Sequence, residues 1–314
     1  MSAPTQHNNS MTASAPSRLD ATLLTGMPIL FVVLWSTGFI GAKFGLPYAE
    51  PFTFLLIRSL LTLALLIPLV VLIGHDWPAG WRLRSHIAVS GLLVHGAYLG
   101  GVFYGIYLGM PAGLTSLLVG LQPLLTATLA GPLLGERITV HQWLGLALGL
   151  VGITLVLGSK LDPGAELFHG FGLGALACVM VALVGITLGT LYQKRFCTGM
   201  PLLSGTAIQY LAASSLFGLG ALAFEERHID WNLTFALTLG WLVLVLSLAA
   251  ILLLMALIRR GEASRVASLF YLVPPVTALQ AWWLFGEQFS LVALLGMVIT
   301  IVGVLLAVRS QAQR

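Results

Sequence analysis

The sequence has very little charge. Asp, Glu, Lys and Arg make up 8% of its 314 residues, against about 25% in an ordinary soluble domain. Hydrophobic residues make up 58%. So few charged side chains cannot cover the surface of a water-soluble protein of this length, so a soluble globular protein is excluded. Lipid is expected to surround most of the chain.

Other chemistry is scarce as well. The two cysteines, Cys178 and Cys197, show no metal-ligand spacing, and we expect no disulfide between them. No GxxxxGK[ST] loop is present, which leaves direct ATP drive unsupported. The net charge of +4 comes from basic residues scattered singly and in pairs, unlike the clustered patch of a nucleic-acid-binding protein. We therefore expect no cofactor, no metal and no nucleic-acid partner.

What the chain does contain is an internal repeat. Residues 121–136 read LQPLLTATLAGPLLGE and residues 272–287 read LVPPVTALQAWWLFGE. They align without gaps at an offset of 151 residues. A repeat of this kind indicates two related halves. The aligned pairs are Pro123 with Pro274, Thr126 with Thr277, Gly135 with Gly286, Glu136 with Glu287 and, upstream, Lys43 with Lys194.

Apolar runs long enough to cross a bilayer recur along the chain. A hydrocarbon core of about 30 Å needs about 20 apolar residues per helix. The sequence predicts an all-α integral membrane protein with ten transmembrane helices. The expected helices are 27–45, 52–73, 86–107, 112–133, 141–158, 168–192, 202–224, 235–258, 264–285 and 290–308.

These helices divide into two repeats of five. The expected first repeat covers 27–158 and the second 168–308, joined by a linker at 159–167. Residues 1–26 are rich in Ser, Thr, Ala and Asn and are expected to form a disordered cytoplasmic tail. Residues 309–314 are expected to form a second cytoplasmic tail.

Basic residues predict the orientation. With the N-terminus inside, 11 of the 15 Lys and Arg residues fall in cytoplasmic segments, three fall outside and Arg58 lies within a span. Cytoplasmic loops carry this excess in membrane proteins. We expect a multi-pass protein of the cell inner (plasma) membrane with both termini in the cytoplasm. Because five helices is an odd number, the second repeat must be inverted relative to the first, an architecture typical of secondary transporters.

Specific motifs carry a family resemblance. They are WSTGFIGAKFG at 35–45, Arg58 in helix 2, and the paired LLGER at 133–137 and LFGEQ at 284–288. Over residues 28–308 the chain resembles the drug/metabolite transporter superfamily, in its ten-helix branch of two EamA-type domains. The resemblance implies export of amino acids, other metabolites or drugs. It also implies a central cavity lined chiefly by helices 1, 3, 4, 6, 8 and 9.

Several polar or aromatic residues within spans are candidates for binding a substrate. Aromatic side chains with polar tips suit a pocket for a small, partly apolar solute, and they also suit plain helix packing. His95 and Tyr98 share one face of helix 3. Either His95 carries or senses a proton, or it is an interior histidine with a cross-helix hydrogen bond. The candidates are Trp35, Ser36, His95, Tyr98, Gln122 and Tyr271.

Other singular residues have expected structural roles. Arg58 either attracts a substrate carboxylate or anchors the fold, and its place in helix 2, outside the implied lining, favours the anchor. Pro123 and Pro274 are expected to kink helices 4 and 9 in mid-span.

Glycines mark helix ends and close packing. Gly135 and Gly286 suit the left-handed position after a helix, and Glu136 and Glu287 suit the N-terminus of the helix that follows. Helices 5 and 10 carry small residues that allow close approach, either within the monomer or in a homodimer. These small residues are Gly145, Gly149, Gly152, Gly296, Thr300 and Gly303.

Together these features predict a secondary transporter or facilitator, not an enzyme. It is expected to export a small metabolite, such as an amino acid, by alternating access. Efflux of drugs or cationic compounds is an alternative, weakened because no acidic residue lies in mid-span to compensate a cation. Helix 1 also lacks the glutamate on which small four-helix exporters of the superfamily rely. A membrane-embedded enzyme and a non-transporting sensor are alternatives from other classes.

Overall fold

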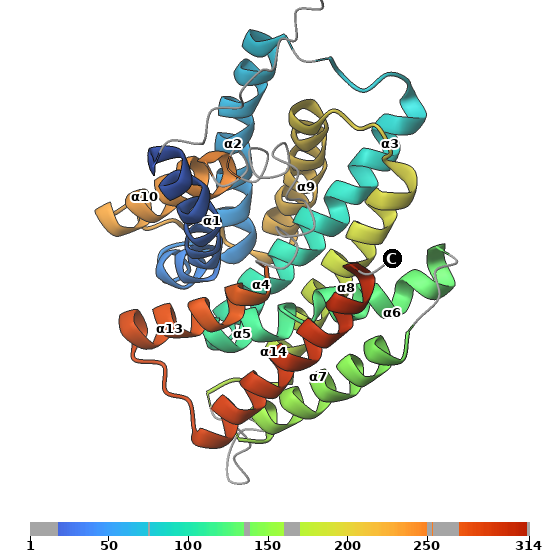
Figure 1. Ribbon diagram of the computed structural model, residues 1–314. Helices are drawn as coiled ribbons and strands as arrows, with labels where there is room; N and C mark the ends of the chain where they lie inside the picture. Colours follow the sequence, from blue (N-terminus) through green and yellow to red (C-terminus); the bar gives the residue numbers. More distant parts are fainter. Residues whose placement is uncertain are drawn as a thin grey trace, which may run out of the picture.

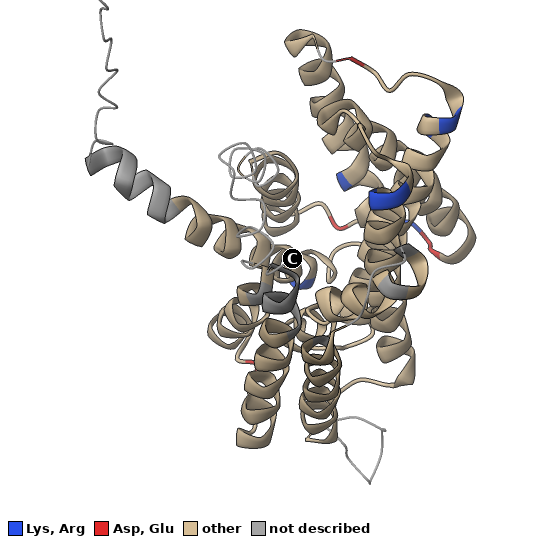
Figure 2. Cartoon of the chain, turned by 45° about the vertical axis from the view of Figure 1, so that its right-hand side comes forward, with Lys and Arg blue, Asp and Glu red and all other residues tan. Residues whose placement is uncertain are grey.

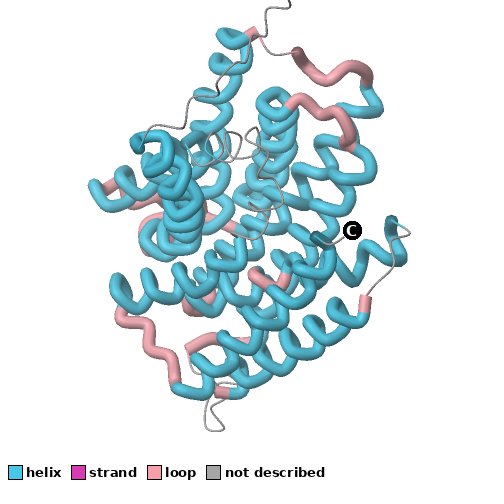
Figure 3. Tube along the Cα trace, in the orientation of Figure 1, coloured by secondary structure: helices cyan, strands magenta, loops and turns pink. Residues whose placement is uncertain are grey.

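The computed structural model describes residues 18–74, 76–134, 139–159, 170–249, 253 and 270–312. These residues form helices joined by short loops (Figure 3). Charged side chains lie mostly at helix ends and in loops, and the helices are otherwise uncharged over most of their length (Figure 2).

Each half contributes a series of helices, and one π-helical stretch is described in each half (Figure 1). The first half comprises α1 (Arg18–Gly45), α2 (Pro51–Ile73), α3 (Trp81–Gly91), the π-helix η1 (Leu92–Ala97), α4 (Tyr98–Tyr107), α5 (Ala112–Val119), α6 (Gln122–Leu134) and α7 (Val140–Gly158). The second half comprises α8 (Leu173–Phe196), α9 (Leu202–Phe224), α10 (Leu233–Gly240), the π-helix η2 (Trp241–Ala249), the 3₁₀ turn η3 (Phe270–Leu272), α13 (Val273–Phe285) and α14 (Leu291–Ala312).

The expected spans correspond to these elements where the structure describes them. Residues 250–252 and 254–258 of the expected span 235–258, residues 264–269 of the span 264–285 and residues 160–167 of the expected linker lie outside the described residues. By length and composition, six described helices can cross a membrane, and three shorter apolar helices accompany them. Several boundaries differ from the expected ones: α3 begins at Trp81, α8 covers Leu173–Phe196, and α14 continues to Ala312, into the expected C-terminal tail. The N-terminal boundary was also predicted wrongly. Helix α1 begins at Arg18, so residues 18–26 are helical and do not belong to a disordered tail. They contain Leu and Ala, which are good helix formers, and no proline.

The repeat is visible in the helix boundaries. Both ends of α2 map onto both ends of α9 at the offset of 151, and the same holds for α6 and α13. The π-helix η1 maps inside η2. The two halves therefore share their irregular turns as well as their helices.

The halves are inverted relative to each other. Glu225, just after the end of α9, accepts hydrogen bonds from the backbone at the start of α2. The equivalent helices α2 and α9 therefore run antiparallel. Helices α7 and α14, the last of each half, lie side by side along their length (Figure 1). The chain is an all-helical membrane protein of two inverted five-helix repeats.

Glycines hold α7 and α14 together inside one chain. A Cβ atom built on Gly296 would lie 2.5 Å from the carbonyl oxygen of Gly152. One built on Gly303 would lie 2.6 Å from the carbonyl oxygen of Gly145. These glycine faces are therefore occupied within the monomer and are not available as the seam of a homodimer.

The two repeated prolines do not kink continuous helices. Helix α5 ends at Val119, two residues intervene, and α6 begins at Gln122 with Pro123 in its first turn. Pro274 likewise lies in the first turn of α13, after the 3₁₀ turn η3. The mid-helix kinks were predicted wrongly, because a proline costs little in a first turn, where its missing N–H has no intrahelical acceptor to lose.

Candidate transport cavity

A cavity lies between the two halves at mid-depth in the helices. Its volume is about 130 Å³. It is lined from the first half by α1, α2, η1 and α4, and from the second by α8, α9 and η2. The lining residues are Trp35, Gly38, Phe39, Arg58, Val94, His95, Tyr98, Leu99, Val102, Phe103, Ile186, Tyr210 and Leu246.

Three of the predicted binding residues meet in this cavity. Trp35 reaches it from α1, His95 from η1 and Tyr98 from the start of α4. The His95 ring also stacks on Tyr210 of the other half, with ring centroids 4.5 Å apart. The structure thus brings together side chains that are more than 100 residues apart in the sequence.

The other predicted binding residues lie elsewhere. Ser36 is fully buried and donates a hydrogen bond to the carbonyl oxygen of Val32 at 2.7 Å. Gln122 donates to the hydroxyl of Thr126 at 3.2 Å, within its own helix. Neither residue lines the cavity. The side chain of Tyr271 lies outside what the structure describes.

The two π-helical stretches supply part of the wall. A π turn adds a residue to the helical repeat and so changes the direction of the following side chains, and such turns are frequent at functional sites. His95 belongs to η1. Its repeat equivalent, Leu246, belongs to η2, and both face the cavity.

Arg58 lines the cavity, although its position in helix 2 predicted otherwise. It is 4% exposed. Its Nη2 donates to Ser247 at 3.3 Å, and its Nε is buried without an acceptor among the described residues. Ser247 donates its one proton to the carbonyl oxygen of Leu242 at 3.0 Å, so its oxygen accepts from both Arg58 and Tyr210. The feature of the sequence that could have placed Arg58 in the cavity is that it is the lone basic residue within an expected span.

The lining differs from the set that the family resemblance implied. Helices 1, 3, 6 and 8 contribute as expected, but the lining also includes α2 and α9, which are helices 2 and 7. Helices 4 and 9, here α5–α6 and η3–α13, contribute none of the described lining residues.

Three phenylalanines pack together beside the cavity, on the side of the expected outer face. Phe103 lines the cavity and packs on Phe54, with ring centroids 5.3 Å apart. Phe54 packs in turn on Phe235 of the second half, at 5.1 Å. All three are buried. We refer to Phe54, Phe103 and Phe235 as the aromatic plug.

Loops from both halves cover this plug. Ala49 and Ile229 form an isolated antiparallel bridge. The backbone N–H of Asp230 donates to the carbonyl oxygen of Tyr48 at 2.8 Å. The α1–α2 and α9–α10 loops are therefore joined on the face where the plug lies.

A buried carboxylate ties the same elements together. Glu225 is 8% exposed. It accepts from the backbone N–H groups of Phe52 and Thr53 at 2.7 Å, from the Thr53 hydroxyl at 2.8 Å and from the Tyr104 hydroxyl at 3.0 Å. It thereby caps the N-terminus of α2, where the helix dipole favours a negative charge.

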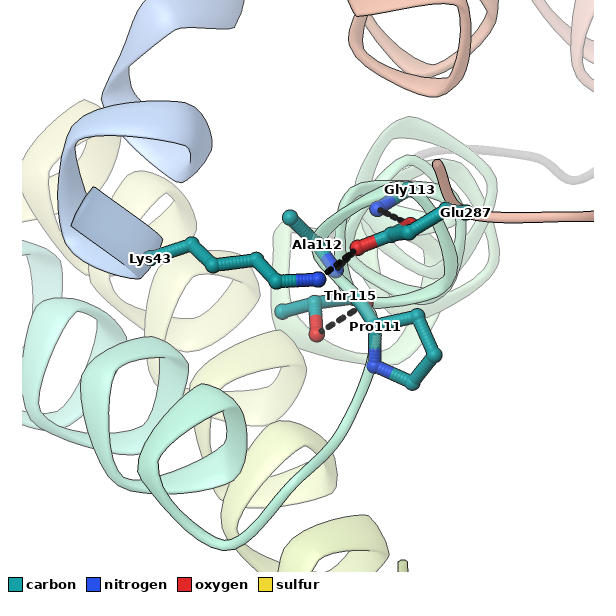
Figure 4. Close-up of polar contacts among 6 residues, drawn as sticks. All are labelled: Lys43, Pro111, Ala112, Gly113, Thr115 and Glu287. Atoms are coloured by element: carbon teal, nitrogen blue, oxygen red, sulfur yellow. Dashed lines mark hydrogen bonds and ion pairs between the residues drawn. The ribbon is translucent and has the colours of Figure 1, made fainter. Parts of the chain in front are cut away.

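Glu287 forms a second link between the halves (Figure 4). Its carboxylate lies 2.6 Å from the Lys43 ammonium, and it accepts from the backbone N–H groups of Ala112 at 2.8 Å and Gly113 at 3.2 Å. It therefore caps α5, not the helix that follows it. The N-terminus of that helix, α14, is capped by Ser290, which accepts from the backbone of Ala293 at 3.1 Å.

Gly286, the residue before Glu287, adopts the left-handed conformation that was expected after a helix. Gly286 ends α13 in the left-handed conformation, with φ of 66°. The expected role of Glu287 at the following helix was wrong, because the loop turns its side chain back toward α5 in the other half. The equivalent residues Gly135 and Glu136 lie outside the described residues.

Comparison with known proteins places this geometry in context. A model of the EamA-like transporter family matches residues 24–158 and again residues 172–309. A probable amino-acid metabolite efflux pump of Salmonella typhimurium is 27% identical, covering 88% of this chain and 92% of that protein. The uncharacterized transporter YvbV of Bacillus subtilis is 28% identical, covering 90% and 91%. The uncharacterized inner membrane transporter YedA of Escherichia coli is 26% identical, covering 90% of each chain.

A solved crystal structure shares the fold. It superimposes with a TM-score of 0.63 at 20% sequence identity, covering 93% of this chain and 98% of that one. At this identity the likeness supports the helical architecture alone.

Proposed function

Because the chain belongs to the EamA-like transporter family, we propose that it exports a small metabolite related to amino acids across the inner membrane by alternating access. It is a multi-pass membrane transporter, not an enzyme. The proposed substrate class draws on the names of relatives, two of which are probable amino-acid metabolite efflux pumps. The location follows the relative named as an inner membrane transporter.

The observation that carries the proposal is the cavity between two inverted halves. A site at this position can face either side of the membrane when one half rocks against the other. Here the aromatic plug packs beside the cavity, and links at Glu225 and Glu287 join the two halves on the same face. Exchange with that face requires these links to separate.

Trp35, His95 and Tyr98 are proposed to contact the solute. The indole of Trp35 packs edge-on against Phe270, with ring centroids 5.0 Å apart, which fixes its orientation. His95 adds a group that titrates near neutral pH in water, so a role in carrying or sensing a proton remains a prediction. Replacement of His95 by Gln tests it, and an unchanged rate and pH profile would remove that role.

Efflux of cationic compounds is supported less well. Arg58 contributes a positive charge to the lining, and no described lining residue is an Asp or Glu. A cation would meet like charge in a medium of low polarity, which is unfavourable.

Solute counterflow in proteoliposomes tests the proposal. Purified wild-type protein is loaded with unlabelled amino acids, related organic acids or cationic dyes, and uptake of the labelled compound is measured. Trp35→Ala is expected to lose most of the exchange. Trp283→Ala is the matched control, because Trp283 is 76% exposed on the outside of α13 and does not line the cavity.

The outcomes of this experiment distinguish metabolite export from drug efflux and from the absence of transport. Accumulation of an amino acid or a related acid, lost in Trp35→Ala and kept in Trp283→Ala, supports the proposal. Exchange of dyes alone favours drug efflux. No exchange from folded protein contradicts a transport role for this cavity.

A further inference from the structure

We propose that the cavity selects a monocarboxylate with an apolar or aromatic body, and that Arg58 binds its carboxylate. The inference rests on the transport function proposed above and names the chemical class of its substrate. It starts from the balance of donors, acceptors and charges around the cavity.

The polar groups of the lining are mainly donors. A guanidinium has five N–H donors and no acceptor, and an indole has one donor and no acceptor. Among the described residues the Arg58 guanidinium has one protein acceptor, the Ser247 hydroxyl at 3.3 Å. Its Nε is buried without a partner. No hydrogen bond within the described protein engages the Trp35 indole or the Tyr98 hydroxyl, so these donors are left for a solute rich in acceptors.

The charge of the lining points the same way. Arg58 is the only Lys or Arg, and no Asp or Glu accompanies it among the described lining residues. The nearest acidic residue along α2 is Glu50, just before its first turn. Glu225, which also lies at that end, is already bound by four donors. A buried charge is costly unless it is paired, so an incoming anion completes the pair.

A zwitterion fits less well than an anion. The ammonium of an amino acid needs acceptors or a carboxylate, whereas the described lining offers Tyr hydroxyls, one imidazole and aromatic faces. A planar carboxylate matches the fork of an Arg side chain and binds it through two parallel hydrogen bonds. The lining therefore favours a carboxylic, 2-oxo or 2-hydroxy acid over the corresponding amino acid.

The rest of the cavity suits an apolar body. Phe39, Leu99, Val102 and Ile186 are among the apolar residues that surround the polar groups. The volume of about 130 Å³ is similar to that of an engineered apolar cavity of about 150 Å³ that accepts benzene. The body expected in the cavity is therefore about the size of one aromatic ring or a branched aliphatic chain, joined to the carboxylate by a short linker.

A series with one body and four head groups tests the proposal on the unmodified protein. The probes are 3-phenylpropanoate, phenylalanine, 3-phenylpropanamide and 2-phenylethylamine, each titrated by calorimetry into full-length protein in nanodiscs. We expect the carboxylate to bind about 10- to 100-fold more tightly than the amide, as a charge-assisted hydrogen bond predicts. The amine is expected to bind most weakly. Equal affinity for the carboxylate and the amide would overturn the proposal without any mutation.

Variants then separate binding from a structural role. Arg58→Gln is expected to abolish the preference for the carboxylate over the amide while leaving affinity for the amide within about threefold. Arg58→Lys is expected to restore part of the preference. The control is Arg82→Gln, which removes an exposed arginine at the start of α3. If Arg58→Gln weakens all four compounds equally, Arg58 is an anchor and the proposal fails.

Counterflow distinguishes this inference from the function on which it rests. Exchange of leucine or phenylalanine with no preference for the matching acids would refute the monocarboxylate class and leave the transport function intact. Tight binding of the carboxylate without counterflow would support the site and refute transport.

Discussion

A buried carboxylate surrounded only by hydrogen-bond donors cannot be replaced by an amide without a loss of protein stability. Glu225 accepts four hydrogen bonds at the start of α2, and the amide nitrogen of a glutamine would face one of those donors. A buried donor left without an acceptor destabilises the folded protein by more than the net free energy that its hydrogen bond contributed. Single residues of this kind hold the closed face of the molecule together.

Glu225→Gln is therefore expected to destabilise the protein by roughly 2–3 kcal/mol. Glu226→Gln is the matched control, because the neighbouring Glu226 is exposed and its loss is expected to change stability by less than about 0.5 kcal/mol. Thermal or denaturant unfolding in detergent measures both. Equal stabilities of the two variants would show that the buried carboxylate does not hold α2.

Sequence reasoning anticipated part of the cavity lining, and the role of these residues in binding stays a prediction. Trp35, His95 and Tyr98 stood out because polar aromatic groups are uncommon in mid-span, and the structure places all three in the cavity. Ser36 was misplaced because adjacent residues on a helix point about 100° apart. Arg58 was recognised as singular but placed outside the cavity, because the sequence does not show the rotation of α2 about its axis.

At the scale of helices, glycine decides how closely α7 and α14 approach. Their small residues form an antiparallel seam in which Gly152 meets Gly296 and Gly145 meets Gly303. The Cβ atoms that substitutions would add meet backbone atoms, which cannot rotate away as a flexible side chain can.

Gly303→Ala is expected to force the two helices apart and to cost about 1–3 kcal/mol through overpacking. Gly240→Ala is the control, because a Cβ there meets nothing within 4 Å and alanine favours a helix. The measurement is the thermal midpoint of each purified variant. A midpoint for Gly303→Ala equal to or above that of Gly240→Ala would contradict the close packing.

Helix breaks and π turns were beyond the reach of sequence patterns. The apolar runs predicted continuous helices, yet α5 and α6 are separate and η1 and η2 are π-helical. The π-helical turns occur in both halves at matching positions, whereas the residues that precede η3 lie outside the described part of the chain. Hydrophobic periodicity places a helix along the chain, but it does not show where one turn departs from α-helical geometry.

For the whole molecule, the joined loops over the aromatic plug are expected to act as a gate. Ala49 belongs to the first half and Ile229 to the second, and they face each other in one bridge. Opposed residues of antiparallel strands have Cα atoms about 4.5–5.5 Å apart, within the range for a disulfide.

The double variant Ala49→Cys with Ile229→Cys is therefore expected to lose counterflow when oxidised and to regain it on reduction. Each single variant serves as a control and should keep its activity under both conditions. Full exchange by the cross-linked protein would show that this face need not open.

The orientation in the membrane is a second property of the whole molecule. The Lys and Arg bias places Glu226 outside and His141 inside, and both are exposed. An impermeant maleimide is expected to label Glu226→Cys in intact cells and His141→Cys only after lysis. Native Cys197 should react slowly because it is 5% exposed and burial raises the pKa of its thiol. Labelling in the reverse order would invert the assigned topology.

The sequence by itself determined that lipid surrounds most of the chain, the number and rough limits of the helices, and the inverted repeat. These follow from local composition, from a periodicity along the chain and from an odd number of spans, none of which requires a contact to be known. Only the tertiary structure decided which mid-span side chains share a cavity and which helix Glu287 caps. Those outcomes depend on the rotation of each helix and on contacts such as that between Glu287 and Ala112, which lie 175 residues apart, and local sequence does not specify either.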